Sequence, residues 1–380
     1  MTTTMSRVIT TRAAIVPEVG ADFEIATVEL ETPRPDEVIV RVVAAGVCHT
    51  DLNIAGGNIP FSFPAVLGHE GAGVVERVGA DVRRVEVGDR VLLTFTSCGR
   101  CEQCRRGQVA LCAFHLPWNL LSGRRADGTT GLSHKGDDVS GHFFGQSSFA
   151  ERALVSERSL VRLPRDTSDD DLARYAPLGC GLQTGAGAIL NVLRPGPGDT
   201  VVIAGAGAVG LAAVMAAALT AVRRIIVLDR VPARLAIAQE VGATDIIDTS
   251  ERDARAAILD LTGGGADIAV DSTGNIAVIE SLLDSLAIGG TCGLIGAPKA
   301  GSRASLDVNA FLPGRKVVGI TEGNSEPESF IPQLIELHRA GRFPIDRLMR
   351  TFAFEDIDAA VAAARSGEVI KPVLTFRGDS

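Results

Sequence analysis

The sequence has no excess of basic residues and no long apolar segment. Its 380 residues include 37 Lys and Arg against 46 Asp and Glu, which gives a formal net charge of −9. Binding to nucleic acid needs a basic surface, so this balance argues against a nucleic-acid partner, although a basic pocket for a phosphate group is compatible with it. The most apolar run, residues 211–222, is shorter than the roughly 20 residues of a transmembrane helix and predicts a buried helix instead. We therefore expect no membrane partner.

No targeting segment is evident near the N-terminus. Residues 1–14 are polar and rich in threonine, without the apolar core and cleavage site of a signal peptide. We therefore expect a cytoplasmic protein, in which clustered cysteines are more often metal ligands than disulfides. Aromatic residues make up only 4% of the chain, so those that gather near a motif are informative.

The first part of the chain is rich in predicted strands and turns. Short apolar runs are separated by Pro and Gly, and this spacing predicts a compact, antiparallel, barrel-like domain. The clearest of these strands cover residues 38–43, 71–78 and 90–93. Residues 121–142 are rich in glycine and charge and lack periodicity, which predicts a long loop of the kind that is usually functional or mobile.

From about Leu178 the pattern changes to alternating strands and helices, which predicts a doubly wound parallel sheet of the α/β class. The predicted strands cover residues 200–204, 224–229, 266–271 and 293–296, and the predicted helices cover residues 208–220, 231–241 and 275–286. After about Gly319, helices are predicted at residues 329–340 and 354–366 and a strand at residues 369–376. The pattern leaves open whether the β-rich part and this tail form one discontinuous domain around an inserted sheet.

A cluster of cysteines has the spacing of a structural metal site. Cys98, Cys101, Cys104 and Cys112 follow the pattern Cys-x2-Cys-x2-Cys-x7-Cys. Four thiolates so close in sequence can surround one tetrahedral zinc, which leaves no coordination position open for chemistry. The alternatives are an iron–sulfur cluster or thiols without metal. The bacterial ferredoxin run has a three-residue last gap and a following Pro, and this sequence has neither.

The sequence GAGAVG, which begins at Gly205, fits the dinucleotide-binding pattern G-x-G-x-x-G. Alone the pattern is weak, but here it follows a predicted strand, opens a predicted helix and precedes an acid, Asp229, at the end of the next strand. Gly205 allows the tight turn, Gly207 lets the backbone approach a pyrophosphate, and Gly210 lets helix and strand pack closely. The alternative is a glycine-rich packing turn without a ligand. Asp229 favours NAD over NADP because a carboxylate repels a 2′-phosphate, while the adjacent Arg230 weakens that inference.

Three further segments carry candidate metal ligands. Cys48 lies in GVCHTD, His69 in GHEGAG and Cys180 in LGCGLQTG. They are far apart in sequence, and each alone is interpreted as an ordinary buried residue. Together with the cysteine cluster and the glycine motif, however, they occur in the order found in the medium-chain, zinc-dependent alcohol dehydrogenases, which the chain resembles over essentially its whole length. The segments LGCGLQTGAG and FFGQSSF are similar to the aryl-alcohol (benzyl alcohol) dehydrogenase branch of that family.

The resemblance implies a fold, two zinc ions per chain and an NAD cofactor. A Rossmann domain of residues 182–320 would be inserted in a β-rich, GroES-like catalytic domain of residues 1–181 and 321–380. Cys48, His69 and Cys180 would hold a catalytic zinc with its fourth position open to a substrate oxygen. Asp51 matches the carboxylate that orients the histidine ligand, and Glu70 matches the acid beside the zinc.

The resemblance also implies a path for the substrate proton and a set of cofactor contacts. Thr50 matches the hydroxyl that takes the proton and passes it through the cofactor ribose. Many relatives complete this relay with a histidine where this chain has Asn53, which cannot act as a base, so solvent or another group takes the proton. His49 and Lys371 match pyrophosphate contacts; for Lys371 the alternative is a solvated surface lysine. The residues expected to contact the dinucleotide are His49, Thr184, Gly205, Gly207, Ala208, Val209, Gly210, Asp229, Arg230, Arg234, Ile295, Ala297 and Lys371.

Aromatic residues near these motifs suggest the substrate. The positions expected to line the pocket are Phe95, Trp118, Phe143, Phe144 and Ile295, with ordinary core packing as the alternative for each. Such a pocket suits benzyl or allylic alcohols. Relatives with an insertion like residues 121–142 tend to be dimers, so we expect a homodimer, with a tetramer as the alternative. We expect the two copies to pair through the sheet domain near residues 302–311.

We therefore expect an NAD-dependent oxidation of a hydrophobic primary alcohol to its aldehyde. One alternative is the same scaffold acting on another alcohol or on a thiol–formaldehyde adduct. Another is a non-catalytic, cofactor-binding structural or regulatory protein, which would not need an open zinc site. A zinc-free quinone reductase is disfavoured because such proteins lack both cysteine sets.

Overall fold

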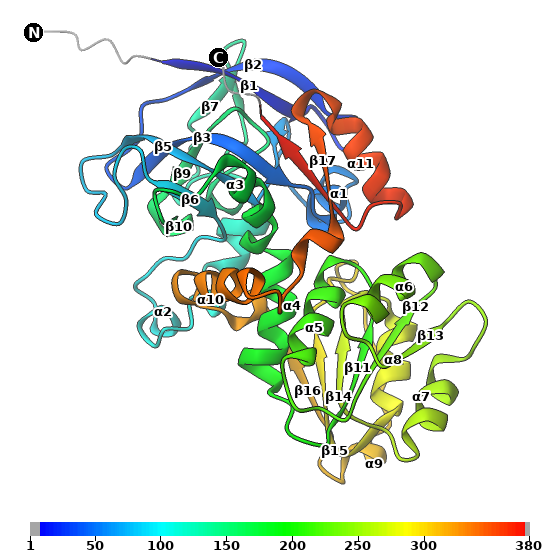
Figure 1. Ribbon diagram of the computed structural model, residues 1–380. Coiled ribbons are helices and arrows are strands. Elements are labelled where there is room, and N and C mark those ends of the chain that lie inside the picture. Colours follow the sequence, from blue (N-terminus) through cyan, green and yellow to red (C-terminus); the bar gives the residue numbers. More distant parts are fainter. Residues whose placement is uncertain (1–7, 377–380) are drawn as a thin grey trace, which may run out of the picture. The chain divides into compact units, whose positions relative to one another are not determined.

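The computed structural model describes residues 8–376, and Figure 1 shows its helices and strands. The first seven residues, half of the segment in which we expected no signal peptide, lie outside the described residues. Of the described residues, 8–180, 326–332 and 348–376 form one compact unit, and 181–325 with 333–347 form another. The predicted domain boundaries, after residues 181 and 320, stay a prediction about which segments fold together.

The first unit is built on two sheets. One has the strand order β4-β1-β2-β7-β8 and is antiparallel throughout. Its strands are β1 (Ile9–Val16), β2 (Glu24–Leu30), β4 (Ala65–Val66), β7 (Leu132–His134) and β8 (Asp137–Val139). The other has the order β10-β6-β5-β3-β18-β17, with β9 also paired to β3. Its strands are β3 (Glu37–Gly46), β5 (Gly71–Val78), β6 (Arg90–Leu93), β9 (Arg152–Ser156), β10 (Leu160–Leu163), β17 (Met349–Ala353) and β18 (Lys371–Thr375).

Short helices connect these strands. They are α1 (His49–Ala55), α2 (Glu102–Arg105), α3 (Asp169–Tyr175) and α11 (Ile357–Ser366). Single turns of 3₁₀ helix cover Val109–Leu111, Phe143–Gly145, Glu157–Ser159, Ala176–Gly179 and Phe354–Asp356, and a π-helical turn covers Pro117–Leu121. One apolar core joins the two sheets, with side chains from β1, β3, β5 and β9 among its members. The predicted antiparallel strands at residues 38–43, 71–78 and 90–93 correspond to β3, β5 and β6.

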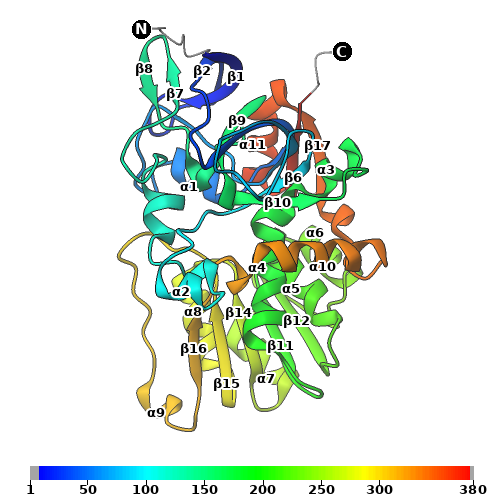
Figure 2. The ribbon, with the colours of Figure 1, turned by 90° about the vertical axis from the view of Figure 1, so that its left-hand side faces the viewer.

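The prediction of a long loop over residues 121–142 was wrong. This segment contains the hairpin β7–β8, which extends the first sheet beside β2 (Figure 2). A buried guanidinium anchors it: Arg125 donates to both carboxylate oxygens of Glu37, at 2.6 and 2.8 Å. Sequence periodicity missed the hairpin because each strand has only three residues, with exposed aspartates in β8.

The second unit is a doubly wound α/β domain, as predicted. Its strands are all parallel, and their order is β13-β12-β11-β14-β15-β16. They are β11 (Thr200–Ala204), β12 (Arg224–Asp229), β13 (Asp245–Asp248), β14 (Ala266–Asp271), β15 (Leu286–Leu294) and β16 (Lys316–Gly319). Numbered along the chain this is the order 3-2-1-4-5-6, in which a dinucleotide binds outside the carboxyl ends of the strands.

Helices alternate with these strands. They are α4 (Gly181–Gly187), α5 (Ala208–Ala218), α6 (Pro232–Glu240), α7 (Ala254–Thr262), α8 (Ile276–Asp284) and α9 (Val308–Phe311). A π-helical turn covers Ala188–Leu193, and 3₁₀ turns cover Glu322–Asn324 and Ile345–Leu348. Helix α10 (Pro327–Arg339) runs from the first unit into the second. Residues 211–217 are buried in α5, so the most apolar run is a core helix, as predicted.

Helix α8 and strand β15 correct the predicted boundaries. The helix was predicted to reach residue 286 and the strand to begin only at 293, whereas the helix ends at Asp284 and the strand covers Leu286–Leu294. Gly289 and Gly290 weaken the strand signal in the sequence. Pairing with β14 on one side and β16 on the other stabilises the strand nevertheless. No helix within residues 8–376 has the length and apolar composition that crossing a membrane requires.

Candidate active site and metal centres

The four clustered cysteines converge as their spacing predicts. Their sulfur atoms all lie within 4.8 Å of one another, and the Cys98 and Cys104 sulfurs are 3.9 Å apart. Backbone N–H groups of Cys101 and Cys98 donate to the sulfurs of Cys98 and Cys112, each at 3.3 Å. None of the seven cysteines, all of which lie within residues 8–376, is in a disulfide bond.

The surroundings of this cluster lower the pKa of Cys98 and Cys101, whereas burial raises the pKa of Cys104, to about 12, and that of Cys112. Backbone hydrogen bonds from Ala113 and Cys104 lower the pKa of Cys101 to about 6. Gly99 and Gly107 have φ angles of +66° and +76°, which let the chain turn tightly around the sulfurs. Four sulfurs at this separation suit a closed tetrahedral zinc site.

A second cluster is formed by Cys48, His69, Glu70 and Cys180. One ligand atom from each lies within 4.8 Å of the others. Cys48 precedes helix α1, the two middle residues precede strand β5, and Cys180 follows the turn Ala176–Gly179. The structure therefore brings together three segments that spacing alone could not connect.

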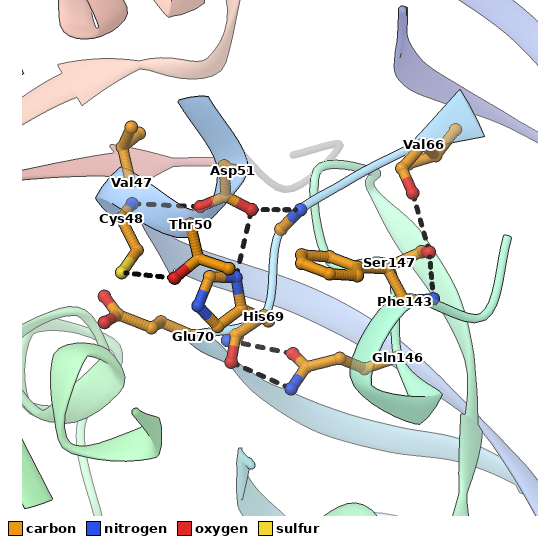
Figure 3. Close-up of polar contacts among 12 residues, drawn as sticks. Val47, Cys48, Thr50, Asp51, Val66, His69, Glu70, Phe143, Gln146 and Ser147 are labelled. Carbon is orange, nitrogen blue, oxygen red and sulfur yellow. Dashed lines mark hydrogen bonds and ion pairs between the residues drawn. The ribbon is translucent and has the colours of Figure 1, made fainter. Parts of the chain in front are cut away.

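One ring nitrogen of His69 is in a position to bind a metal. Figure 3 shows its Nδ1 atom directed at Oδ1 of Asp51, 3.0 Å away. The ring is fully buried, and Nε2 has no hydrogen-bond partner. A buried nitrogen without a partner costs free energy unless a ligand engages it. Two neighbouring cysteine sulfurs and this nitrogen match the donor set of a catalytic zinc with a fourth position open.

Asp51 binds backbone groups of two segments in addition to the His69 ring. Its carboxylate also accepts hydrogen bonds from the backbone N–H groups of Cys48, at 2.9 Å, and Gly68, at 3.0 Å. One buried carboxylate thus connects the Cys48 segment to the His69 segment (Figure 3). These contacts suit the orienting role that the resemblance implied for Asp51, and that role stays a prediction.

The charges in this site are strongly coupled. A hydrogen bond with Cys180 lowers the pKa of Cys48 well below its ordinary value, against the effect of burial, and the Lys371 ammonium adds to the lowering. Burial opposes a charged imidazole, but Asp51 and Cys48 outweigh it and raise the pKa of His69. The same anions would stabilise a metal cation, which competes with the proton for the imidazole nitrogen.

Lys371 is not a solvated surface lysine. Its ammonium donates to both carboxylate oxygens of Glu70, at 2.9 and 2.8 Å, and to the carbonyl of Val47. The two side chains are 2% and 0% exposed, so this is a buried ion pair beside the metal ligands. A β-carbon at Gly46 would lie only 2.1 Å from Oε2 of Glu70, so glycine there leaves room for the carboxylate. Contact of Lys371 with a pyrophosphate stays a prediction.

Two of the predicted pocket aromatics lie against the histidine. Phe144 stacks on the His69 ring with centroids 4.5 Å apart, and Phe143 meets it edge-on at 5.0 Å. Phe95 instead contacts His115, and Trp118 stacks on Phe114 at 4.9 Å. On the other side, Oγ1 of Thr50 lies 3.8 Å from the Cys48 sulfur.

The glycine motif has the geometry of a dinucleotide site. Gly205 follows β11 with φ = +93°, and a β-carbon at Gly210 would lie 1.8 Å from the Gly205 carbonyl oxygen. Gly207 caps helix α5, and a β-carbon added there would meet no atom within 4 Å, so open space adjoins the helix N-terminus. Ala208 and Val209 form the first turn of that helix, whose N–H groups suit a pyrophosphate.

The other predicted cofactor contacts lie in several settings. Asp229 ends strand β12, and its carboxylate accepts hydrogen bonds from the backbone of Ala206 at 2.7 Å and Val231 at 2.9 Å. Arg230 is exposed, whereas Nε of Arg234 is buried without a hydrogen-bond partner. His49 is exposed on α1, Thr184 is buried on α4, and Ile295 and Ala297 follow β15.

Comparison with known proteins agrees with this geometry. Residues 34–165 match the alcohol dehydrogenase GroES-like domain, and residues 208–339 match the zinc-binding dehydrogenase domain. Geraniol dehydrogenase of Castellaniella defragrans is 42% identical over 371 residues, which is 97% of this chain and 98% of the relative. The chain belongs to the medium-chain, zinc-dependent alcohol dehydrogenase family.

Solved structures of similar proteins confirm the predicted fold of this alcohol dehydrogenase, a GroES-like part with a Rossmann-type sheet. An alcohol dehydrogenase zinc-binding domain protein from Burkholderia ambifaria has a TM-score of 0.93 and 46% identity, covering 98% of this chain and all of its own. Benzyl alcohol dehydrogenase from Acinetobacter calcoaceticus has a TM-score of 0.92 and 40% identity, covering 97% of this chain and all of its own.

One residue of the dehydrogenase site was missed at the sequence level. Gln146 is fully buried, donates to the carbonyls of His69 at 2.9 Å and Thr94 at 3.0 Å, and accepts from the backbone of Gly71 at 3.2 Å (Figure 3). It therefore holds the segment that carries His69 and leads into strand β5. The segment FFGQSSF pointed to it, but only as a family resemblance. Phe144 and Ser147 there have φ angles of +53° and +48°, a left-handed backbone that the sequence does not reveal.

Proposed function

We propose that the chain catalyses the reversible, NAD-dependent oxidation of a hydrophobic primary alcohol, aryl or allylic, to its aldehyde. The observation that carries the proposal is the buried, unpartnered Nε2 of His69 beside the sulfurs of Cys48 and Cys180. When bound there, zinc would supply Lewis acidity toward the substrate oxygen, and the nicotinamide would accept the hydride.

The chain's own residues support this chemistry in defined ways. Asp51 holds the His69 ring so that one nitrogen is free, and the Glu70–Lys371 ion pair keeps a carboxylate beside the ligands without a net charge. We propose that the hydroxyl of Thr50 takes the substrate proton. Asn53, three residues further on, cannot receive it as a base, so we propose that the proton passes to solvent.

The aromatic environment supports the substrate class. Phe143 and Phe144 are fully or almost fully buried against the His69 ring, which gives the site an apolar, aromatic wall. Aromatic pairs contribute about 0.5–1.5 kcal/mol beyond burial, which favours a benzyl or allylic group over a short alkyl chain. The names of the relatives, a geraniol dehydrogenase and a benzyl alcohol dehydrogenase, support the same class.

The cofactor preference follows from Asp229. Its carboxylate is held at the end of β12 by two backbone N–H groups, where a 2′-phosphate would be repelled. We therefore propose NAD as the cofactor. The nearby cations Arg230 and Arg234 would limit how strongly NAD is preferred over NADP.

An alcohol panel tests substrate and cofactor together. Initial rates are measured at 340 nm with benzyl alcohol, geraniol and ethanol, each with NAD⁺ and with NADP⁺. We expect kcat/KM for the first two alcohols to exceed that for ethanol by at least about tenfold, which corresponds to about 1.4 kcal/mol. We expect NAD⁺ to be preferred for every substrate. Turnover of none of these alcohols would contradict the proposed function.

A further inference from the structure

The turn after strand β16 has an unusual backbone. Glu322, Gly323 and Asn324 have φ angles of +49°, +62° and +46°, so three consecutive residues lie in the left-handed region. Two of them are not glycine, and such residues adopt this conformation only where their surroundings fix it. Strained turns of this kind are often found where a ligand is held.

Close contacts with helix α4 and the following turn fix this conformation. A β-carbon on Gly323 would lie 2.8 Å from Cα of Gly187, so the two backbones touch without side chains between them. The side chain of Asn191 donates to the Gly323 carbonyl at 3.1 Å. The Ser325 hydroxyl donates to Oε1 of Gln183 at 2.8 Å. The turn is therefore part of a rigid unit with α4.

This turn presents a carboxylate to a hydroxyl. The hydroxyl of Thr184, on α4, donates to Oε2 of Glu322 at 3.3 Å. The two residues are 7% and 8% exposed. A buried carboxylate accepts hydrogen bonds only, and it binds an N–H donor strongly because the bond is charge-assisted.

The pair lies beside the glycine motif at the carboxyl edge of the sheet. A β-carbon on Gly185, next to Thr184, would lie 1.9 Å from the carbonyl oxygen of Val209 in the first turn of α5. Glu322 follows β16, on the opposite side of β11 from β12, which carries Asp229. In this strand order the dinucleotide crosses the carboxyl edge, so Asp229 faces the adenosine half and the Glu322–Thr184 pair lies on the nicotinamide side.

We propose that the Glu322 carboxylate, positioned by Thr184, accepts a hydrogen bond from the carboxamide N–H₂ of the nicotinamide. This inference rests on the proposed use of a nicotinamide dinucleotide. The carboxamide amine is the polar donor at that end of the cofactor. Glu322 would thus orient the ring and select the amide over analogues that lack it.

Binding of three ligands tests this directly. Dissociation constants are measured by calorimetry for NAD⁺, for 3-acetylpyridine adenine dinucleotide and for ADP-ribose. The second ligand has a methyl ketone in place of the amide and therefore lacks the N–H, and the third lacks the nicotinamide altogether. The variants are Glu322→Leu, which removes the acceptor, and Glu322→Gln, which keeps the size of the side chain and one neutral acceptor.

We expect the wild type to bind NAD⁺ more tightly than the acetylpyridine analogue. Loss of a charge-assisted hydrogen bond typically weakens binding about 10- to 100-fold, so Glu322→Leu should weaken NAD⁺ by that factor and abolish the preference. Glu322→Gln should give an intermediate preference, and ADP-ribose should bind all three proteins within about twofold.

A preference for NAD⁺ that is absent in the wild type, or unchanged in Glu322→Gln, would overturn the inference. If Glu322→Leu no longer binds ADP-ribose, the glutamine variant decides the question alone. Equal weakening of both dinucleotides would show that Glu322 only supports the fold. Failure of the proposed function is distinguishable, because alcohol turnover would then be absent while the ligand preference remained.

Discussion

At the scale of single residues, the two nitrogens of the His69 ring have different roles. Nδ1 is occupied by the Asp51 carboxylate, and Nε2 is left without a hydrogen bond in a fully buried position. Because Asp51 also binds the backbone of Cys48 and Gly68, it positions two ligand segments at once. The reactive site therefore depends on a carboxylate that is not itself one of the proposed ligands.

Replacing the Asp51 carboxylate should weaken zinc binding at Cys48, His69 and Cys180 without removing zinc from the four-cysteine site. Asp51→Asn keeps the shape of the side chain but removes the charge that orients the imidazole. We expect a 10- to 100-fold loss in affinity for the zinc at the His69 site and a similar loss in kcat/KM. Competition with a chelator measures the affinity. Asp260→Asn, on the exposed face of α7, is the matched control. An Asp51→Asn protein with wild-type zinc affinity would contradict the orienting role.

The sequence could predict individual ligands only where they are local. The cysteines from Cys98 to Cys112 are close enough in the chain that spacing alone indicates one metal. Cys48, His69 and Cys180 converge through the tertiary fold, so their grouping needed the family resemblance. Gln146 could not be found from pattern at all, because its role depends on a left-handed turn and on hydrogen bonds to distant carbonyls.

At the scale of elements, buried polar groups lie on both sides of the hairpin β7–β8. Before it, Arg125 binds Glu37, and the two side chains are 4% and 5% exposed. His142, between that hairpin and Phe143, is buried with its Nδ1 atom unpartnered. Burial lowers the pKa of His142 to about 4, so the ring is neutral in the folded protein.

This histidine should make stability depend on pH in a defined window. Its folded pKa of about 4 lies below the ordinary value of 6.5, so the unfolded chain binds the proton first as pH falls. The contribution is fully present above pH 6.5 and is lost as pH falls toward 4. The loss is about 3 kcal/mol, from about 1.4 kcal/mol for each pH unit.

His142→Leu removes that proton-linked term. Between pH 7 and pH 4, the free energy of unfolding of the variant should therefore fall by about 3 kcal/mol less than that of the wild type. Urea denaturation followed by circular dichroism measures both curves, and His134→Leu, on β7 of the same hairpin, controls for the loss of a histidine nearby. Parallel pH curves for wild type and His142→Leu would show that burial of this ring does not set the dependence.

Elements with long apolar runs were predictable from the sequence, and those stabilised mainly by strand pairing were not. Strands β11 and β12 contain continuous apolar runs, β14 is mostly apolar, and α5 is apolar on every side, so these elements stand out in the sequence. Strand β15 begins earlier than predicted because pairing with β14 and β16 stabilises it, although its glycines have a low intrinsic preference for a strand. Hairpin β7–β8 has too few residues for a period to be seen.

At the scale of the whole molecule, we expect a homodimer formed through the edge of the parallel sheet. Strand β16 is the last strand of that sheet, and exposed apolar side chains lie around it. The exposed fractions are 81% for Ile288, 76% for Leu312, 67% for Val308 and 42% for Val317. An exposed edge strand with apolar side chains invites pairing with a second copy. The residues lie close to the segment 302–311 from which a pairing surface was predicted.

A lysine on the edge strand should disrupt this pairing. Val317→Lys places a charge where two copies would meet, and we expect it to convert the dimer to a monomer while preserving the fold. Light scattering after size-exclusion chromatography gives the mass. Val87→Lys, at a valine that is 57% exposed in the first unit, is the control and should remain dimeric. A monomeric wild type, or a Val317→Lys protein of unchanged mass, would contradict the interface.

We propose that the chain carries two zinc sites with different tasks, and metal content measured together with turnover tests this most directly. We expect two zinc ions per chain in the wild type by elemental analysis. We expect one in Cys48→Ala, which should lose alcohol turnover by at least about a thousandfold, about 4 kcal/mol in activation free energy, and still bind ADP-ribose. Cys292→Ala, at a buried cysteine outside both clusters, should retain both ions and activity. One zinc ion in the wild type, or full turnover in Cys48→Ala, would contradict the account.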